Sequence, residues 1–149
     1  MTPGKNKSNV SKSVTELIDL IPSAVIIADD QGYIVAANKA NKQLVGYSSE
    51  EIVGKKIAAS DFFGKDAMSI LQKKLKMRLK GRQIPPYEVK IKTKNDGVKF
   101  LELKANIIEY KGRVYDLVIL TDVTERSNNQ KQLQQALIKS EEKFYGITN

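Results

Sequence analysis

The amino-acid sequence predicts an α+β domain built on one sheet. Two short apolar runs, 24–28 and 33–37, lie near its start, and three extended segments follow residue 85. Helical patterns occupy the chain between these groups, and strands at both ends with helices between them are typical of this fold class. A length of 149 residues, with 41% hydrophobic and 28% charged residues, fits one globular domain with tails.

The first expected elements are a tail, a helix and a hairpin. Residues 1–12 are small and polar, so we expect a flexible tail that is not a signal peptide. From Ser13, apolar residues recur every three or four positions until Pro22, which predicts a helix. The runs 24–28 and 33–37 flank an acidic turn that contains glycine, which indicates a β-hairpin.

Three helices are expected in the middle of the chain. Asn38 is a candidate N-cap for a first helix that ends at Gly46. Ser48 and Glu51 have the spacing of a capping box, which predicts a second, short helix. Residues 65–80 carry a methionine and leucines on one face, so they predict the longest helix within the domain.

Three antiparallel strands are expected to complete the sheet. Val89, Ile91 and Thr93 alternate with the lysines at 90 and 92. This alternation predicts a strand with one apolar, buried face and one basic, exposed face. An Asn-Asp-Gly turn at 95–97 leads to a second alternating strand at 101–107. Residues 114–121 are apolar on both faces apart from Asp116, so we expect this strand to be central and covered on both sides.

The composition changes after about Arg126, where Gln, Lys and Glu become frequent. A weak heptad-like seam runs through Gln130, Leu133, Leu137, Ser140 and Phe144. We therefore predict a tail at 1–12, a folded domain at 13–126, and an exit helix or coiled-coil linker at 127–149. The linker could pair with a second copy of itself.

Five local patterns occur in a fixed order along the chain. They are AVIIADDQGYIVAAN (24–38), ANKANKQLVGYSSEEIVGKK (37–56), NDGVKFLEL (95–103), IEYKGR (108–113) and DVTER (122–126). Each is weakly specific, but the ordered set resembles the PAS sensor domain family across residues 14–126. The resemblance implies a five-stranded antiparallel sheet with helices on one face and flanking helices at both ends.

The end of the chain extends the resemblance. SEEKFYGI (140–147) is similar to the lead-in helix of a following PAS repeat. The chain therefore looks like the first PAS module of a longer signalling protein, which we expect to be a sensor histidine kinase.

The resemblance also implies a route for signal output through Asp122, Thr124 and Arg126. If a helix begins here, Asp122 and Arg126 are close enough to pair, and Thr124 can cap the helix. We expect a shift of the sheet, caused by a ligand, a partner or a dimer rearrangement, to pass through these residues into the exit helix. A plain strand-to-helix cap is the alternative.

In this family the sheet and the middle helices enclose a pocket that holds haem, flavin, a small acid or nothing. The inward-facing residues that we expect around it are all apolar: Ile26, Ala28, Leu44, Ile52, Ile57, Phe62, Leu71, Leu75, Val89, Ile91, Leu101, Leu103, Val118 and Leu120. The chain has no His and no Cys, which excludes His-ligated haem and a Cys–flavin adduct. No cofactor is required, and a filled core, an apolar small ligand such as a fatty acid, and other ligands remain open.

The net charge of +8 is confined to one segment. Residues 72–104 carry 11 basic and 3 acidic side chains, and Lys90, Lys92 and Lys104 are expected together on the outer face of the sheet. The alternative function is therefore a basic nucleic-acid-binding domain. No aromatic stacking platform and no known nucleic-acid-binding signature accompanies these lysines, so a solvated face or a docking surface for acidic partners is favoured.

Catalysis and membrane contact are not expected of this chain. Without His or Cys, no nucleophile–base pair has a suggestive spacing, and we expect no metal site. No apolar run approaches the roughly 18 residues that a membrane span requires. We expect a cytoplasmic, non-enzymatic input module that forms a homodimer and contacts downstream modules of the same protein.

Overall fold

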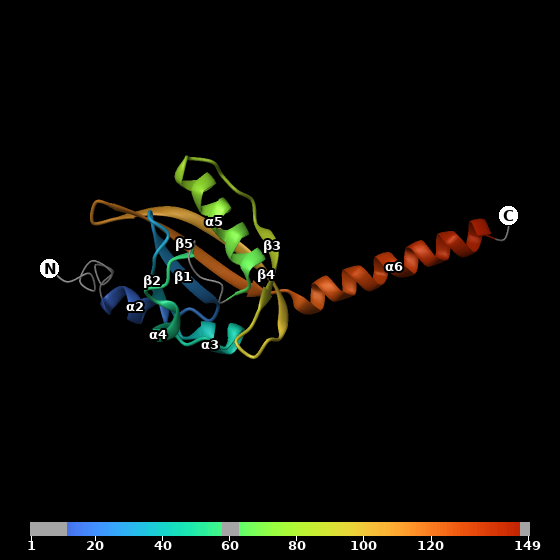
Figure 1. Cartoon of the computed structure of the whole chain (residues 1–149), viewed down its shortest axis with the longest axis horizontal. Helices are drawn as coiled ribbons and strands as arrows, with labels where there is room; N and C mark the ends of the chain where they lie inside the picture. The colour runs from blue at the N-terminus through green and yellow to red at the C-terminus, as the bar shows by residue number, and fades with distance from the viewer. Residues whose placement is uncertain (1–11, 58–62, 147–149) are drawn as a thin grey trace.

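The computed structural model describes residues 12–57 and 63–146, and it shows a five-stranded antiparallel sheet with flanking helices (Figure 1). The strand order is β2-β1-β5-β4-β3. The strands are β1 (Ala24–Asp29), β2 (Ile34–Ala37), β3 (Tyr87–Lys92), β4 (Val98–Tyr110) and β5 (Arg113–Asp122). The predicted α+β fold with one sheet is confirmed.

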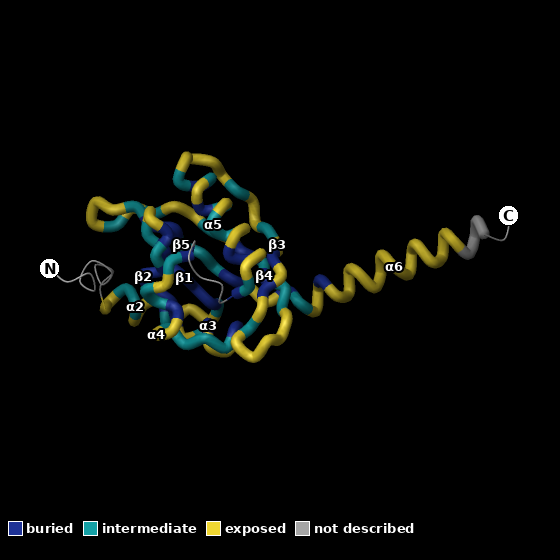
Figure 2. Tube along the Cα trace, in the orientation of Figure 1, coloured by how far each residue is buried: buried dark blue, intermediate teal, exposed yellow. Residues whose placement is uncertain are grey.

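The helices lie on both faces of this sheet. They are α2 (Lys12–Ile18), α3 (Ala40–Val45), α4 (Ser49–Ile52), α5 (Lys65–Leu79) and α6 (Thr124–Gly146). Residues of α3, α4 and α5 pack with the inner face into the main core, whereas α2 contributes to a smaller cluster on the outer face. α6 projects away from the sheet, and its exposed surface is clear in Figure 2.

β5 lies in the middle of the sheet, as its two-faced apolar pattern predicts. It pairs with β1 through Val25↔Ile119 and with β4 through Leu103↔Leu120. Leu120 belongs to the inner core, and Ile119 packs against the outer cluster. α2 supplies part of the outer cover that this pattern requires.

Two of the expected helix caps have different outcomes. The capping box between Ser48 and Glu51 is present, with the backbone N–H of Glu51 donating to Ser48 Oγ at 3.3 Å. The prediction for Asn38 was wrong, because Lys39 is the N-cap of α3. Asn38 is fully buried, and its Oδ1 accepts a hydrogen bond from Val25 N at 2.8 Å. Tertiary contacts therefore outweigh the local capping preference.

The ends of the chain fall partly outside the described residues. The tail at 1–12 lies outside them except for Lys12, with which α2 begins. No helix in the described ranges is both long and apolar enough to cross a bilayer. α6 begins at Thr124, slightly before the predicted boundary of the linker.

Candidate functional site

A small internal cavity lies between the inner face of the sheet and α5. Its volume is about 30 Å³, and Leu71, Leu103 and Val118 are among the side chains that line it. A cavity needs roughly 10–15 Å³ of such volume to hold one water molecule, so this one has room for only a few waters. As bounded by the described residues, it has no room for a haem, a flavin or a fatty acid unless the core rearranges.

The structure places the predicted pocket residues in or against the main core, apart from Phe62, which lies outside the described residues. Leu44, Leu71 and Val118 are partly buried against this core, and the others are buried within it. Phe63, the neighbour of Phe62, is the buried aromatic of this segment. Their use in ligand binding stays a prediction.

The residues expected around the pocket are all apolar, but an ion pair that was not among them lines the same cavity. Arg78 of α5 and Asp116 of β5 are 6% and 2% exposed. Arg78 Nε donates to Asp116 Oδ1 at 2.9 Å, and Arg78 Nη2 donates to Oδ2 at 2.6 Å. Burial disfavours the guanidinium charge, but the hydrogen bonds and the charge of Asp116 hold the pKa of Arg78 above its ordinary value.

The phenol of Tyr87 on β3 adds a second polar group close to this pair. Among the described residues its buried Oη has no hydrogen-bond partner within bonding geometry. Burial raises the pKa of Tyr87, and the neighbouring guanidinium of Arg78 partly opposes this shift. The interior therefore contains an ion pair and an unsatisfied hydroxyl, and the sequence analysis identified neither.

The second candidate site is the junction between the sheet and α6, which β4 holds in place. Phe100 N donates to Thr124 Oγ1 at 3.0 Å, and Val123 N donates to Phe100 O at 2.9 Å. About two turns further along α6, Lys131 Nζ lies 4.1 Å from the centroid of the Phe100 ring. The start of α6 therefore rests on one residue of β4 through backbone, hydroxyl and ring contacts.

Asp122 connects this junction to the helical layer through Lys99. Asp122 Oδ1 accepts a hydrogen bond from Thr124 N at 2.9 Å, and Asp122 Oδ2 lies 3.7 Å from Lys99 Nζ. The same ammonium donates to Leu44 O at 2.6 Å, near the end of α3. Partial burial raises the pKa of Asp122, but hydrogen bonds from Thr124 and the charge of Lys99 outweigh this effect and lower it.

Arg126 has a different partner from the one that the sequence suggested. Its Nη2 donates to Glu102 Oε2 on β4 at 3.2 Å, instead of pairing with Asp122. Glu102 lies opposite Thr121 in the β4–β5 register, beside the start of α6. The three predicted relay residues thus lie at one junction, and their partners Lys99, Phe100 and Glu102 were missed.

The basic segment 72–104 is less available to a partner than its composition suggests. Glu88 and Glu102 are register partners on β3 and β4, so acidic residues separate Lys90 from Lys104 on the outer face. Lys94 Nζ lies 2.8 Å from Glu51 Oε2, which further reduces the free positive charge. Nucleic-acid binding therefore stays the weaker prediction.

The described parts of the chain also offer little to a metal ion, since residues 12–57 and 63–146 contain no group of three or more acidic residues that could hold one.

Comparisons with known proteins agree with this architecture. The PAS domain family profile matches residues 22–125, which is more than half of the chain. Sporulation kinase A of Bacillus subtilis (strain 168) is 26% identical over 136 residues, covering 91% of this chain and 21% of that protein. The chain therefore spans about a fifth of the length of this curated relative.

Solved structures show the same fold. An RNA-binding light-oxygen-voltage receptor matches with a TM-score of 0.69 and 19% identity, over 84% of this chain and 36% of that one. A PAS domain from Colwellia psychrerythraea matches with a TM-score of 0.62 and 20% identity, over 78% and 99% of the two chains. These likenesses concern the fold alone, while the profile match identifies the family. The chain belongs to the PAS domain family of sensory modules.

Proposed function

We propose that this PAS domain relays a change in its core to α6, and through α6 to a following module of the same protein. The observation that carries the proposal is the set of contacts between β4 and the start of α6, centred on Phe100 and Thr124. β4 also pairs with β5 along its length, so a shift of the central strands would move the surface on which α6 rests.

Lys99 gives this relay a second connection, to the helices that cover the core. Its ammonium contacts the carbonyl of Leu44 and the carboxylate of Asp122, which holds the first turn of α6. A movement of α3 would therefore change the position or the charge environment of Asp122. These contacts support Asp122, Thr124 and Arg126 as relay residues and add Lys99 to them.

Substituting Thr124→Val tests the junction, because valine keeps the shape of threonine and lacks the hydroxyl. We expect the loss of the Phe100–Thr124 hydrogen bond to cost about 1 kcal/mol locally, so that amide exchange in residues 124–131 becomes about fivefold faster. Hydrogen–deuterium exchange measures this change. Thr121→Val on β5 is the matched control, since Thr121 is exposed and lies before the junction.

If exchange in α6 is the same in the Thr124→Val variant and in wild type, the junction does not hold the helix and the relay has no mechanical basis. In a longer protein that carries the output module, the same variant should weaken the response to the signal and leave the fold of the domain intact.

We also propose that two copies pair through α6. Leu133, Leu137 and Ile138 are 63%, 58% and 48% exposed, and α2 adds Leu17 at 63%. A helix that leaves the domain with exposed leucines at heptad-like spacing is suited to a two-stranded coiled coil.

Exchanging Leu133 and Leu137 together for serine should raise the dimer dissociation constant at least about a hundredfold, because both leucines would lose their buried environment. Sedimentation equilibrium measures this constant. A double serine variant at Gln132 and Gln135 controls for helix propensity. A wild-type chain that is monomeric at high concentration would rule out this dimer.

The proposed parent protein is a sensor histidine kinase, and the likeness to Sporulation kinase A supports this assignment. Kinase output would come from parts of that protein outside this chain. We further propose that the core needs no resident cofactor, which its cavity of about 30 Å³ supports. The cytoplasmic location stays a prediction.

A further inference from the structure

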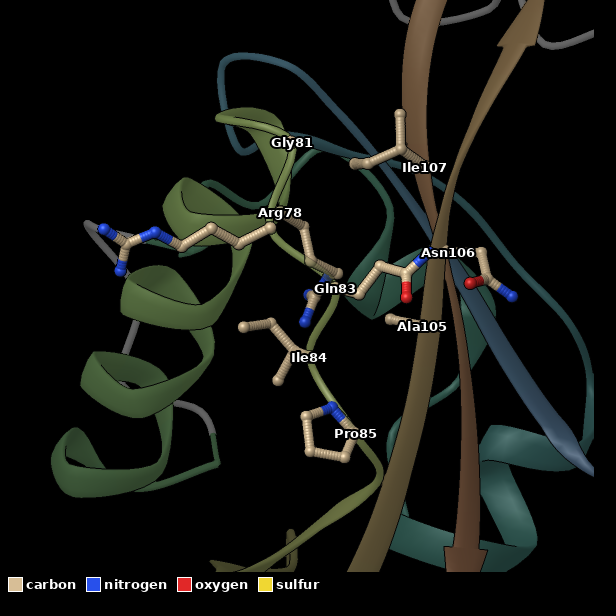
Figure 3. A pocket seen from close by; sticks show the side chains of 9 residues that line it. Arg78, Gly81, Gln83, Ile84, Pro85, Ala105, Asn106 and Ile107 are labelled. Carbon is tan, nitrogen blue, oxygen red and sulfur yellow. The ribbon is translucent and has the colours of Figure 1, made fainter.

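A second, larger pocket lies outside the core, where the segment after α5 passes over β4 (Figure 3). Gly81 has a φ of +88° and ends α5 in a Schellman motif, in which Arg82 N donates to Met77 O at 3.2 Å. This turn sends residues 82–85 back along the strand. The pocket between them has a volume of about 600 Å³, which is within the usual range for small-molecule sites.

The charge of the lining favours an anion. The described residues that line the pocket include two arginines, Arg78 and Arg82, and the amide residues Gln83 and Asn106, but no acidic residue. The Arg82 side chain is exposed, and within the described part of the chain no acidic residue forms an ion pair with it. The positive charge of this wall is therefore only partly neutralised, by Asp116 behind Arg78.

The lining also has an apolar component, which a simple inorganic ion would leave unused. Ile84 and Pro85 come from the connecting segment, and Ala105 and Ile107 come from β4 (Figure 3). Ile107 is 36% exposed, although it lies on a strand at the edge of the core. An occupant with a short apolar body would cover this surface.

Arg78, which lines this pocket, also lies close to a polar group of the core. Arg78 uses Nε and Nη2 for its two hydrogen bonds to Asp116. Its third guanidinium nitrogen, Nη1, takes part in neither of these bonds. The hydroxyl of Tyr87 is buried beside the same guanidinium, and it has no partner in bonding geometry among the described residues. A buried polar group without a hydrogen bond is rare in folded proteins.

We propose that this pocket binds a small organic carboxylate with an apolar body. The carboxylate would lie against Arg82 and the free edge of Arg78, and the apolar body would lie between Ile84 and Ile107. Because Arg78 lines both this pocket and the inner cavity, the ligand would act on the ion pair to the central strand β5. This site is separate from the relay through α6, and either can fail without the other.

Titration of the isotope-labelled chain with sodium butyrate, at an ionic strength kept constant with potassium chloride, tests the site by nuclear magnetic resonance. We expect saturable amide shifts at Gln83, Ile84 and Ile107. Acetate should bind about tenfold more weakly, because it lacks two of the methylenes that butyrate buries. Inorganic phosphate should also bind more weakly than butyrate, since it has no apolar body.

Arg82→Gln should weaken butyrate binding about tenfold, whereas Lys139→Gln removes the same charge from exposed α6 and should leave it unchanged. Equal affinity of wild type and Arg82→Gln would overturn the proposal, as would phosphate binding as tightly as butyrate. Absence of saturable shifts at these amides would also overturn it. The relay is measured separately, by exchange at 124–131, so these results do not depend on it.

Discussion

Replacing Asp116 with alanine is expected to lower the free energy of unfolding by about 3–5 kcal/mol. Asp116 is 2% exposed and supplies both acceptors for the paired hydrogen bonds from Arg78, which is 6% exposed. Without the carboxylate, the guanidinium remains in the core as an unpaired charge. Small domains have total stabilities of about 5–15 kcal/mol, so this one substitution removes a large part of the stability.

The double variant Arg78→Met with Asp116→Leu is the matched control. It removes both charges and keeps an apolar volume at each position, so we expect it to be nearly neutral or even stabilising relative to wild type. Urea denaturation followed by circular dichroism measures both variants. A cost below about 1 kcal/mol for Asp116→Ala would mean that Arg78 finds water or another partner when Asp116 is absent, and that the pair does not hold α5 on the sheet.

The sequence alone did not predict this ion pair, although it predicted the strands and the helix ends. Alternating residues located the strands, and glycines and the capping box located the helix ends, because these features depend on neighbours in the chain. Arg78 and Asp116 are separated by 38 positions, and only the packing of α5 on β5 brings them together. A single acidic residue in an otherwise apolar strand was the available signal, since a buried carboxylate requires a partner.

The junction between the sheet and α6 was likewise predictable from the sequence only in part. The segment 122–126 could be singled out because its strand ending and helix start are local. Its partners Lys99, Phe100 and Glu102 are fixed by the register of β4 on β5, in which Leu101 lies opposite Asp122. A one-residue error in register would exchange the two faces of the strand, so the partner of Arg126 could not be predicted without the observed pairing.

Asn38 was assigned the wrong role for a related reason. Asparagine is favoured at helix N-caps, and its position before α3 satisfies that local rule. The structure instead buries it fully, with Nδ2 donating to Ile18 O at 2.9 Å and to Ser23 O at 2.8 Å. The side chain therefore joins the end of α2 to the start of the sheet, and no local pattern describes such a contact.

Substituting Asn38→Ala should consequently cost about 3 kcal/mol of unfolding free energy, since several buried backbone groups lose their partners at once. Val25 N loses its acceptor, and the carbonyls of Ile18 and Ser23 lose a donor. We also expect amide exchange in α2 to increase more than in α5, because the Asn38 amide holds the last turn of α2.

Two measurements separate this contact from a general loss of packing. Urea denaturation gives the cost of Asn38→Ala, with Asn129→Ala on the exposed surface of α6 as a control that should be within about 0.5 kcal/mol of wild type. Hydrogen–deuterium exchange then compares α2 with α5. A uniform increase in both helices would show that Asn38 only fills volume, whereas an increase confined to α2 would show that its hydrogen bonds attach the N-terminal helix to the sheet. Because Ile18 of α2 packs in one cluster with Val25 and Ile27, that attachment also keeps the outer apolar cluster covered.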